Sequence, residues 1–453
     1  MTHHRLLCHR HRQQGAATLI VVMILFFIIS LVAAYTNRNL IFEQRTSANQ
    51  YRSTQALEAA EAGLEWAVSM LNFGRITNAC IKSTNTSDTS FRQRYLVTDP
   101  VTGKITPALN PGGGAFTSSC VWAGAAGWDC SCPTTGAPVL TVPAGGALAP
   151  AFRVRFLLVN GGNPAVTVAP QPGVVWVQVV GCTRLDVAGS LCLDFGGQGA
   201  LNEGRVEVTS MVALGGNAAG LPSAALTARG AVNLAGGSME VYNTGAGTSG
   251  ITVHASGAVN TATLTAHGAP GTPRAATLIQ NDSTLSPAAV GTFSTADRMF
   301  ASIFNMLPQN FRDQQAAVKL TCGGSGCSAA TVRTALSLNP GSPLWLTGAL
   351  NVDSAGDIGS PTEPALLIVN GDVLFTTSGV NIHGIVYVSL PAGSTDWQAS
   401  GTGRITGAAI VDGGVTSPGS SNTTVVYDSA ILERLRYSTG TFVRVPGSWR
   451  DFQ

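Results

Sequence analysis

Charged and aromatic side chains are both scarce in this chain of 453 residues. Asp, Glu, Lys and Arg together make up 11% of it, and Phe, Trp and Tyr make up 7%, whereas about a quarter of an ordinary soluble domain is charged. The formal net charge is only +2, and no basic patch with interleaved aromatic residues occurs. A chain so close to neutrality has no general attraction for nucleic acid, so we predict no nucleic-acid partner.

Catalytic and metal-binding motifs are absent as well. The sequence holds no G-x-S-x-G elbow, no H-E-x-x-H pair, no P-loop and no EF-hand loop. The three histidines beyond the N-terminal region, His254, His267 and His383, are isolated from one another. We therefore predict that the protein is not an enzyme and holds no metal or other cofactor.

One enzymatic interpretation stays open as the least favoured alternative. Asp353, Asp357, Asp372 and Asp412 lie near turns of a region with β-helix-like texture, and some β-helices cleave polysaccharides with clustered aspartates and a basic residue. Aspartates at such positions usually shape the turns themselves, and no calcium-loop spacing accompanies them. Fold analogy alone is a weak reason to assign an activity.

The chain contains one long apolar run close to its start. Residues 16–34, AATLIVVMILFFIISLVAA, carry no charge, and 18 or more such residues can cross a bilayer as a helix. Arg5, Arg10 and Arg12 precede the run, so the positive-inside rule places the N-terminus in the cytoplasm and the rest of the chain outside. The candidate residues for the membrane, or for a filament core, are Leu19, Ile20, Val21, Leu25, Phe26, Phe27, Ile28 and Leu31.

The helix predicted from this run continues far beyond a membrane. Residues 16–73 contain no Pro and only one Gly, so these positions can form a helix about 87 Å long. Its second half, residues 38–73, is amphipathic, and one face suits packing on a β-sheet. That face carries Leu57, Ala60, Leu64, Ala67, Val68 and Leu71. We interpret the acidic row Glu58, Glu61 and Glu65 as a solvated face, with contact to a neighbouring subunit as the alternative.

Three interpretations of residues 1–37 compete. A basic leader that ends at Gly15, followed by an apolar and then an amphipathic half-helix, is typical of a type IV prepilin. A secretory signal peptide could instead be cut after Val32-Ala33-Ala34, although its apolar region would be unusually long. The third interpretation is a permanent membrane anchor. The residues favour the prepilin.

Both ends of the chain resemble PilX-type minor pilins of type IV pilus systems. The resemblance rests on residues 36–72, TNRNLIFEQRTSANQYRSTQALEAAEAGLEWAVSMLN, and on residues 425–452, VVYDSAILERLRYSTGTFVRVPGSWRDF. It implies that prepilin peptidase cuts after Gly15 and that Ala16 becomes the N-methylated N-terminus. The implied partners are the other minor pilins, the major pilin and a tip-associated adhesin.

The fifth mature position departs from the pattern of major pilins. They carry Glu there, whereas this chain has Ile20. The family's Glu is thought to neutralise the N-terminal ammonium of an adjoining subunit, and an unpaired charge in an apolar core is costly. A subunit without the Glu fits best at the filament tip, where no further subunit must dock above it.

Cysteine usage predicts export to an oxidising compartment. Of nine cysteines, Cys8 lies in the leader, and the eight that remain can form a disulfide framework. Cys182 and Cys192 could staple a hairpin, and Cys322 and Cys327 could close a small loop. Cys80, Cys120, Cys130 and Cys132 then have three possible connectivities. A zinc site from these four is disfavoured because Cys130 and Cys132 are too close for the usual spacing.

The remaining chain predicts an α+β protein. Residues 74–150 read as an irregular, disulfide-tied region, and residues 152–156, 174–180 and 205–209 as antiparallel strands packed on the long helix. From about residue 222, short strands separated by Gly-rich turns favour a β-helix-like region over a β-sandwich. We expect a helical insertion at about 294–320, with Thr295 or Asp297 as its cap, and a helix at 428–437.

These patterns define four segments and one function. The segments are a leader (1–15), the long helix (16–73), a disulfide-tied β head (74–221) and a β-rich repeat-like domain (222–453). We expect a minor pilin that initiates pilus assembly, held in the inner membrane first and at the pilus tip later. The alternative is a surface or tip adhesin with a β-helical head.

Overall fold

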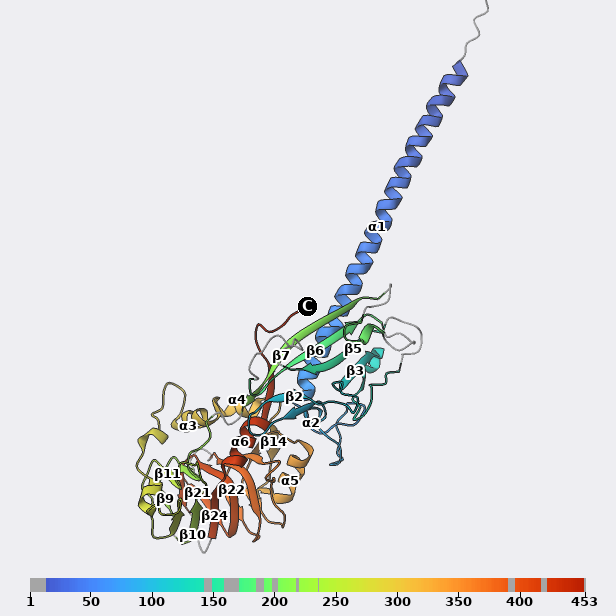
Figure 1. Ribbon diagram of the computed structural model, residues 1–453. Coiled ribbons are helices and arrows are strands. Elements are labelled where there is room, and N and C mark those ends of the chain that lie inside the picture. Colours follow the sequence, from blue (N-terminus) through green and yellow to red (C-terminus); the bar gives the residue numbers. More distant parts are fainter. Residues whose placement is uncertain are drawn as a thin grey trace, which may run out of the picture.

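The computed structural model describes residues 14–141, 149–158, 171–184, 191–197, 203–216, 220–234, 236–389, 396–416 and 422–451. The predicted leader, apart from its last two residues, lies outside the described residues together with Cys8. A single helix projects from a head built on an antiparallel sheet, and a larger unit with parallel sheets lies at the opposite end of the head (Figure 1). The mixed α+β class is as predicted.

The projecting helix is α1 (Gln14–Leu71), 58 residues long. It ends two residues before the predicted end, at a point where Asn72 and Gly74 turn the chain into the head. Residues 17–51 are exposed along their whole length, and burial begins at Ala56. We call residues 17–51 the bare segment.

The head contains a six-stranded sheet in which every described pairing is antiparallel, in the order β25-β7-β6-β5-β3-β4. Its strands are β3 (Thr117–Trp122), β4 (Trp128–Ser131), β5 (Ala151–Leu157), β6 (Val174–Cys182), β7 (Arg205–Gly216) and β25 (Gly440–Arg444). The three predicted strands are therefore β5, β6 and the first part of β7. The expectation that residues 74–150 are irregular was wrong for β3 and β4, whose few apolar residues hide the strand pattern.

Short elements surround this sheet. They are α2 (Phe91–Tyr95), the pair β1 (Leu96–Thr98) and β2 (Ile105–Pro107), and the 3-10 turns η1 (Gly124–Ala126) and η2 (Leu191–Leu193). Ser90 caps α2 in a capping box with Gln93. We use "head" for the described residues of 74–216 together with 440–451.

The last third of α1 lies on the head sheet. The predicted stripe is the face that packs, because Ala60, Leu64, Ala67 and Leu71 are buried in one core with Phe152 and Val179, and Leu57 and Val68 pack at its margin. The contact is very close at β6. A Cβ atom added at Gly181 would lie 2.2 Å from the carbonyl oxygen of Ala56, so only glycine lets the strand approach the helix backbone there.

Parallel strands build the larger unit, which comprises the described residues of 220–439 and which we call the solenoid. One sheet has the order β12-β10-β24-β22-β20-β18-β16-β14, and a second has the order β15-β17-β19-β21-β23-β9. All described pairings in both are parallel. From β16 to β24 the chain alternates between the two sheets, as in the β-helix-like interpretation, whereas a β-sandwich would pair antiparallel strands.

The strands of the first sheet are β10 (Ser238–Tyr242), β12 (Leu264–His267), β14 (Val318–Thr321), β16 (Leu344–Thr347), β18 (Ala365–Asn370), β20 (Asn381–Val388), β22 (Thr402–Val411) and β24 (Asn422–Tyr427). Those of the second are β9 (Val232–Asn233), β15 (Cys327–Ser328), β17 (Leu350–Val352), β19 (Val373–Phe375), β21 (Asp396–Ser400) and β23 (Gly414–Thr416). β8 (Leu226–Ala228), β11 (Val253–Ala255) and β13 (Leu278–Ile279) form a side branch that joins β22 through β8.

The strands do not stack in sequence order. The chain runs first through β8 to β13, returns to β14 beside the head, and then winds outward until β24 pairs with β10. The end distant from the head is therefore β12, whose described partner is β10. There the guanidinium of Arg274 donates to the carbonyl oxygens of Thr261 and Leu264, which covers part of the open edge.

Helices cover one side of the first sheet, so several strands are buried on both faces. Those helices are α3 (Thr295–Phe304), α4 (Pro308–Asp313) and α6 (Ser429–Ser438). Helix α5 (Ala329–Leu338) instead packs in the solenoid core beside β15 and β17, and η3 (Arg274–Thr277) and η4 (Ser283–Leu285) are 3-10 turns. Leu367 and Val386 point into the solenoid core, whereas Leu366 and Ile385 pack with α3 and α6 residues. Burial on both faces explains the continuous apolar runs of β18 and β20.

The predicted helices are present with two corrections. The insertion at 294–320 is α3 and α4, and its N-cap is Ser294, which forms a capping box with Asp297, rather than Thr295 or Asp297 itself. The expected helix at 428–437 is α6, capped by Asp428. Helix α5 was not predicted because its sequence, AATVRTALSL, is rich in Thr and Ser and lacks a strong periodic stripe.

The final strand returns to the head. Residues 440–451 were predicted to belong to the β-rich repeat-like domain (222–453), but β25 pairs with β7 of the head over five residue pairs. The C-terminus accordingly lies near α1 and β7 in Figure 1. The solenoid is therefore inserted between two neighbouring strands of the head sheet.

The close approach of β6 to α1 generates the first testable prediction. Replacing Gly181 with Ala should lower the free energy of unfolding by about 1–3 kcal/mol, because the new methyl group can fit only by separating the helix from the sheet. Gly323→Ala is the control, since a Cβ atom there meets nothing within 4 Å. Urea unfolding of the detergent-solubilised full chain measures both. Equal stability of the two variants would contradict the packing described here.

The candidate assembly helix and its junction with the head

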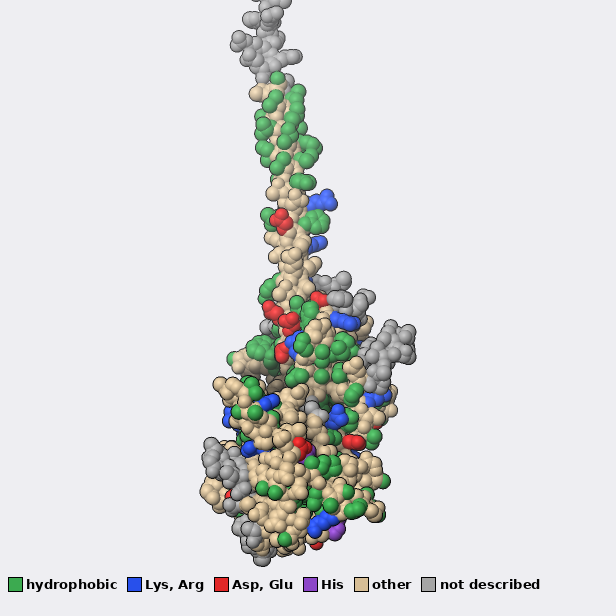
Figure 2. Space-filling view, turned by 90° about the vertical axis from the view of Figure 1, so that its left-hand side faces the viewer, with side chains coloured by type: hydrophobic (Ala, Val, Ile, Leu, Met, Phe, Trp, Pro, Cys, Tyr) green, Lys and Arg blue, Asp and Glu red, His purple; other side chains and the backbone are tan. Residues whose placement is uncertain are grey.

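The bare segment of α1 is an apolar surface that its own chain does not cover. The eight candidate core residues from Leu19 to Leu31 are 54% to 71% exposed. Figure 2 shows apolar side chains around the far part of this helix. Among the described residues, one helix, Ala17–Leu71, is long and apolar enough to cross a membrane by length and composition. Burial of this surface in lipid or among other helices is strongly favoured by the hydrophobic effect.

The predicted processing site lies at the start of the same helix. Gly15 and Ala16 fall within α1. Four residues further on, the fifth position after the predicted cut is Ile20, which is 57% exposed. An isoleucine there can contribute apolar contact but cannot pair with an ammonium group.

The acidic row lies outside the face of α1 that is buried against the head sheet. Glu58, Glu61 and Glu65 are all exposed. Glu65 forms an ion pair with Arg444 of β25, so the solvated-face interpretation is incomplete for this residue. The other two carboxylates have no partner among the described residues.

Asn72 fastens the end of α1 to the last strand of the head. Its side-chain amide donates to the carbonyl oxygen of Phe442 at 2.8 Å, and the Phe442 N–H donates back to the Asn72 side-chain oxygen at 2.7 Å. The same amide donates to Val68 at 3.0 Å. One buried side chain thus satisfies helix and strand backbone groups together, which sequence patterns alone do not reveal.

Arg92 of α2 completes the junction. Its guanidinium is buried and donates to three carbonyl oxygens: Leu71 at 2.9 Å, Gly341 at 3.1 Å and Gly440 at 3.0 Å. These belong to the end of α1, the solenoid and β25. Burial lowers the pKa of Arg92 to about 10, and the guanidinium also lies 5.3 Å from the ring centroid of Phe442. No sequence signal singled out Arg92, because an arginine in a short helix reads as surface.

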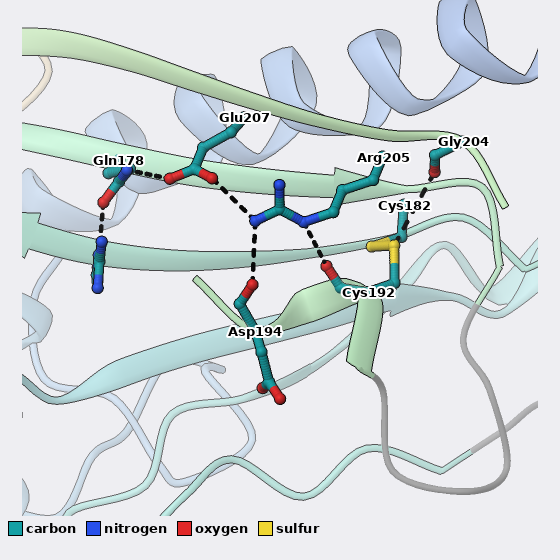
Figure 3. Close-up of polar contacts among 8 residues, drawn as sticks. Gln178, Cys182, Cys192, Asp194, Gly204, Arg205 and Glu207 are labelled. Carbon is teal, nitrogen blue, oxygen red and sulfur yellow. Dashed lines mark hydrogen bonds and ion pairs between the residues drawn. A yellow bond between two sulfur atoms is a disulfide. The ribbon is translucent and has the colours of Figure 1, made fainter. Parts of the chain in front are cut away.

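A polar network lies on the face of the head sheet opposite α1, beside a small apolar cluster that includes Val121 and Val180. Arg205 pairs with Glu207 at 2.8 Å and donates to the carbonyl oxygens of Cys192 and Asp194 at 3.1 and 3.0 Å, while Gln178 donates to Glu207 (Figure 3). The Cys182–Cys192 disulfide anchors the turn that supplies these carbonyls. The network joins β6 and β7 to the segment after β6.

Four disulfides are present among the described residues. Besides Cys182–Cys192, Cys322–Cys327 closes the turn between β14 and β15. The four cysteines whose pairing was open are joined as Cys80–Cys132 and Cys120–Cys130. The second of these bridges β3 and β4, and the first ties the segment after α1 to the end of β4.

The histidines and aspartates considered for chemistry have separate local partners. His254 pairs with Asp282 at 2.7 Å, and His383 lies 3.4 Å from Asp357. Asp353 accepts from the Ala329 N–H at 3.2 Å, as expected of turn residues.

Two aspartates have a raised pKa. Asp412 is buried in an ion pair with Arg229, and burial raises its pKa despite the pairing. Burial also raises the pKa of Asp372. In the described part of the chain no three His, Cys, Asp or Glu side chains come together as metal ligands.

A cleft of about 440 Å³ lies where the solenoid meets the head. Arg92, Arg333, Arg434, Asp357 and Glu363 are among its lining residues. Gln93 on the head side donates to Glu363 on the solenoid side at 3.0 Å. This contact spans the cleft and adds to the junction.

Most of the long helix is similar to a known protein family. The family model described as PilX N-terminal matches residues 14–65. No curated protein matches the chain. Among solved structures, the competence-associated pilin ComZ from Thermus thermophilus aligns over 88% of this chain and 97% of that one, at 12% identity and a TM-score of 0.22. A likeness at that level carries no argument about this chain.

The junction gives the second prediction. Arg92→Met should lower the free energy of unfolding by about 3 kcal/mol, because three buried carbonyl oxygens lose their donor. Arg436→Met on the exposed side of α6 is the matched control and should change it by less than about 0.5 kcal/mol. Thermal or urea unfolding of the full chain in detergent decides the matter. A small effect at Arg92 would mean that water replaces the guanidinium without loss.

Proposed function

We propose that this protein is a minor subunit of a type IV pilus that helps to initiate pilus assembly and takes part in the tip complex, on the support of the match between residues 14–65 and the PilX N-terminal family model. A pilin role itself follows from the family of this helix. The observation that carries the finer proposal is Ile20. Where a subunit stacked above would need a carboxylate for its N-terminal ammonium, this chain offers an apolar side chain.

The proposed path begins in the inner membrane. The bare segment holds the prepilin there, with the head and the solenoid outside, until prepilin peptidase cuts after Gly15. Ala16 then becomes the N-terminus, and the bare segment leaves lipid for a bundle of other pilin helices. Both environments bury the same apolar surface, so the transfer has little hydrophobic cost.

The proposed partners are the other minor pilins, the major pilin and a tip-associated adhesin. Assembly by helix packing and head docking needs no turnover, which agrees with the structural character of the family. The polar network of the head and the separate partners of the aspartates in the solenoid support a non-enzymatic role.

An adhesive role of the solenoid is the second candidate. It is favoured by an aromatic stack at the end distant from the head, where Tyr242 and His267 lie 4.2 Å apart and nearly parallel. The Tyr242 hydroxyl donates to Glu240 at 2.7 Å. If adhesion were the principal role, loss of the protein would reduce attachment while pili and twitching persist.

Processing provides the third prediction. The N-terminal peptide of the native protein should begin at Ala16, and methylation should add to its mass. Peptide mass spectrometry of the protein from sheared pili and from membranes tests this. Gly15→Leu should leave the leader attached and keep the protein in the membrane. A peptide that begins at Tyr35 would mean ordinary secretion and would refute the pilin role.

The fourth prediction concerns position 20. Ile20→Glu would supply the missing carboxylate, so subunits should dock above this one, and the protein should move from filament ends to positions along the filament. Immunogold labelling of the solenoid measures the position. Ile20→Leu is the control and should leave labelling at the ends. Wild-type labelling along whole filaments would contradict the terminal placement.

A further inference from the structure

Three arginines form a stripe along one side of the exposed part of α1. Arg38, Arg45 and Arg52 are spaced by seven residues, and an ideal α-helix drifts by only about 20° over seven residues. They therefore lie almost in line, and we call them the basic stripe. In Figure 2 the basic side chains of the bare segment project from one side of the helix and an acidic side chain from the other.

The chain itself does not neutralise this stripe. Arg38 and Arg45 are exposed, and Arg52 is half-buried beside the head. Arg38 lies 5.7 Å from the ring centroid of Phe42, and within the described residues none of the three forms an ion pair. Three aligned cations on a helix that must be buried in an assembly need carboxylates from another chain.

The same helix shows where such carboxylates can lie. At 100° per residue, Glu65 lies about 180° around the helix axis from Arg38, so the two side chains project from opposite sides. Along the axis, Glu61 lies about 24 Å nearer the head than Arg45. The acidic row thus lies on the opposite side of the helix from the basic stripe, with Glu65 at its margin paired to Arg444 of the head. The basic stripe continues the line of the face that carries the head. Two parallel helices of this type become complementary when one is shifted along its axis by about 24 Å.

Packing geometry determines which helix lies on which side. The bare segment must be surrounded by other helices, and the bulky heads can then lie only on the outside of the bundle. The face of α1 toward its own head consequently points outward, and the acidic face points inward. Consider two parallel subunits, of which the second is displaced toward the membrane. The basic stripe of the first, which points outward, is then at the same height as the acidic face of the second, which points inward.

We propose that the basic stripe docks on the acidic face of the parallel helix of the subunit next beneath this one. The occupant is a pilin-type helix with carboxylates on the side away from its head and a Glu at its fifth mature position. A second copy of this chain satisfies the first condition but not the second, because Ile20 leaves the upper ammonium unpaired. The inference rests on the proposed function and names the contact through which it is carried out.

Charge reversal of the stripe tests the proposal in the producing cell. The full chain replaces the native copy, and quantitative immunoblots measure its amount in sheared pili relative to its amount in the inner membrane. The variants are a triple change, Arg38→Glu with Arg45→Glu and Arg52→Glu, and the same three positions changed to Lys. The matched control is Glu58→Lys with Glu61→Lys, which reverses the opposite face of the same helix.

We expect the triple change to Glu to lower incorporation into pili at least tenfold, because it reverses the charge of the stripe. The triple change to Lys should keep incorporation within twofold of wild type, and so should the control that reverses Glu58 and Glu61. Incorporation of the Glu triple within twofold of wild type would overturn the proposal. Equal loss in the acidic-face control would also overturn it, because a subunit would then dock above as well. If the Glu triple is degraded, a Gln triple replaces it and should lower incorporation at least threefold, with an unchanged level overturning the proposal.

Failure of the proposed function gives a different result. In that case the wild-type chain itself would be missing from sheared pili, and its deletion would leave pilus number unchanged. If only the docking inference is wrong, the wild-type chain is still incorporated and its deletion still reduces piliation. The variants of the basic stripe and of the acidic face would then be incorporated to the same extent.

Discussion

The constraint on which this structure depends is that α1 is longer than its own chain can bury. The head sheet covers the helix from Ala56 onward and leaves residues 17–51 exposed. Apolar surface of that extent requires lipid or other helices. The head therefore packs only on the far third of the helix, and the solenoid extends from the opposite side, where it does not obstruct neighbours of the bare segment.

The junction makes these parts one mechanical unit. Asn72 joins the end of α1 to β25, and Arg92 joins the same end to the solenoid and β25. Because buried groups that lose such partners carry a large desolvation cost, the solenoid cannot easily swing relative to the helix. The placement of α1 among neighbouring helices therefore also fixes the location of the distant end of the solenoid.

Local signals predicted the parts of the fold that depend on local physics. The absence of Pro and the single Gly63 predicted α1, and the apolar run of residues 174–180 predicted β6. The pairing of β25 with β7 and of β24 with β10 could not be predicted, since residues 184 to 232 positions apart meet there without a sequence signal. Asn72 and Arg92 were missed for a related reason: their partners are backbone carbonyls of distant segments, which no side-chain pattern marks.

The return of β25 has a consequence for the order of synthesis. The strand beside β7 is made of residues 440–444, so the head sheet stays incomplete, with β7 as an open edge, until nearly the whole chain has been translated and exported. Until then Asn72 and Arg92 also lack their hydrogen-bond partners in β25, Phe442 and Gly440. A chain cut short anywhere in the solenoid would present an unpaired strand edge and an unfilled junction, which gives proteases a direct means of distinguishing finished subunits from unfinished ones.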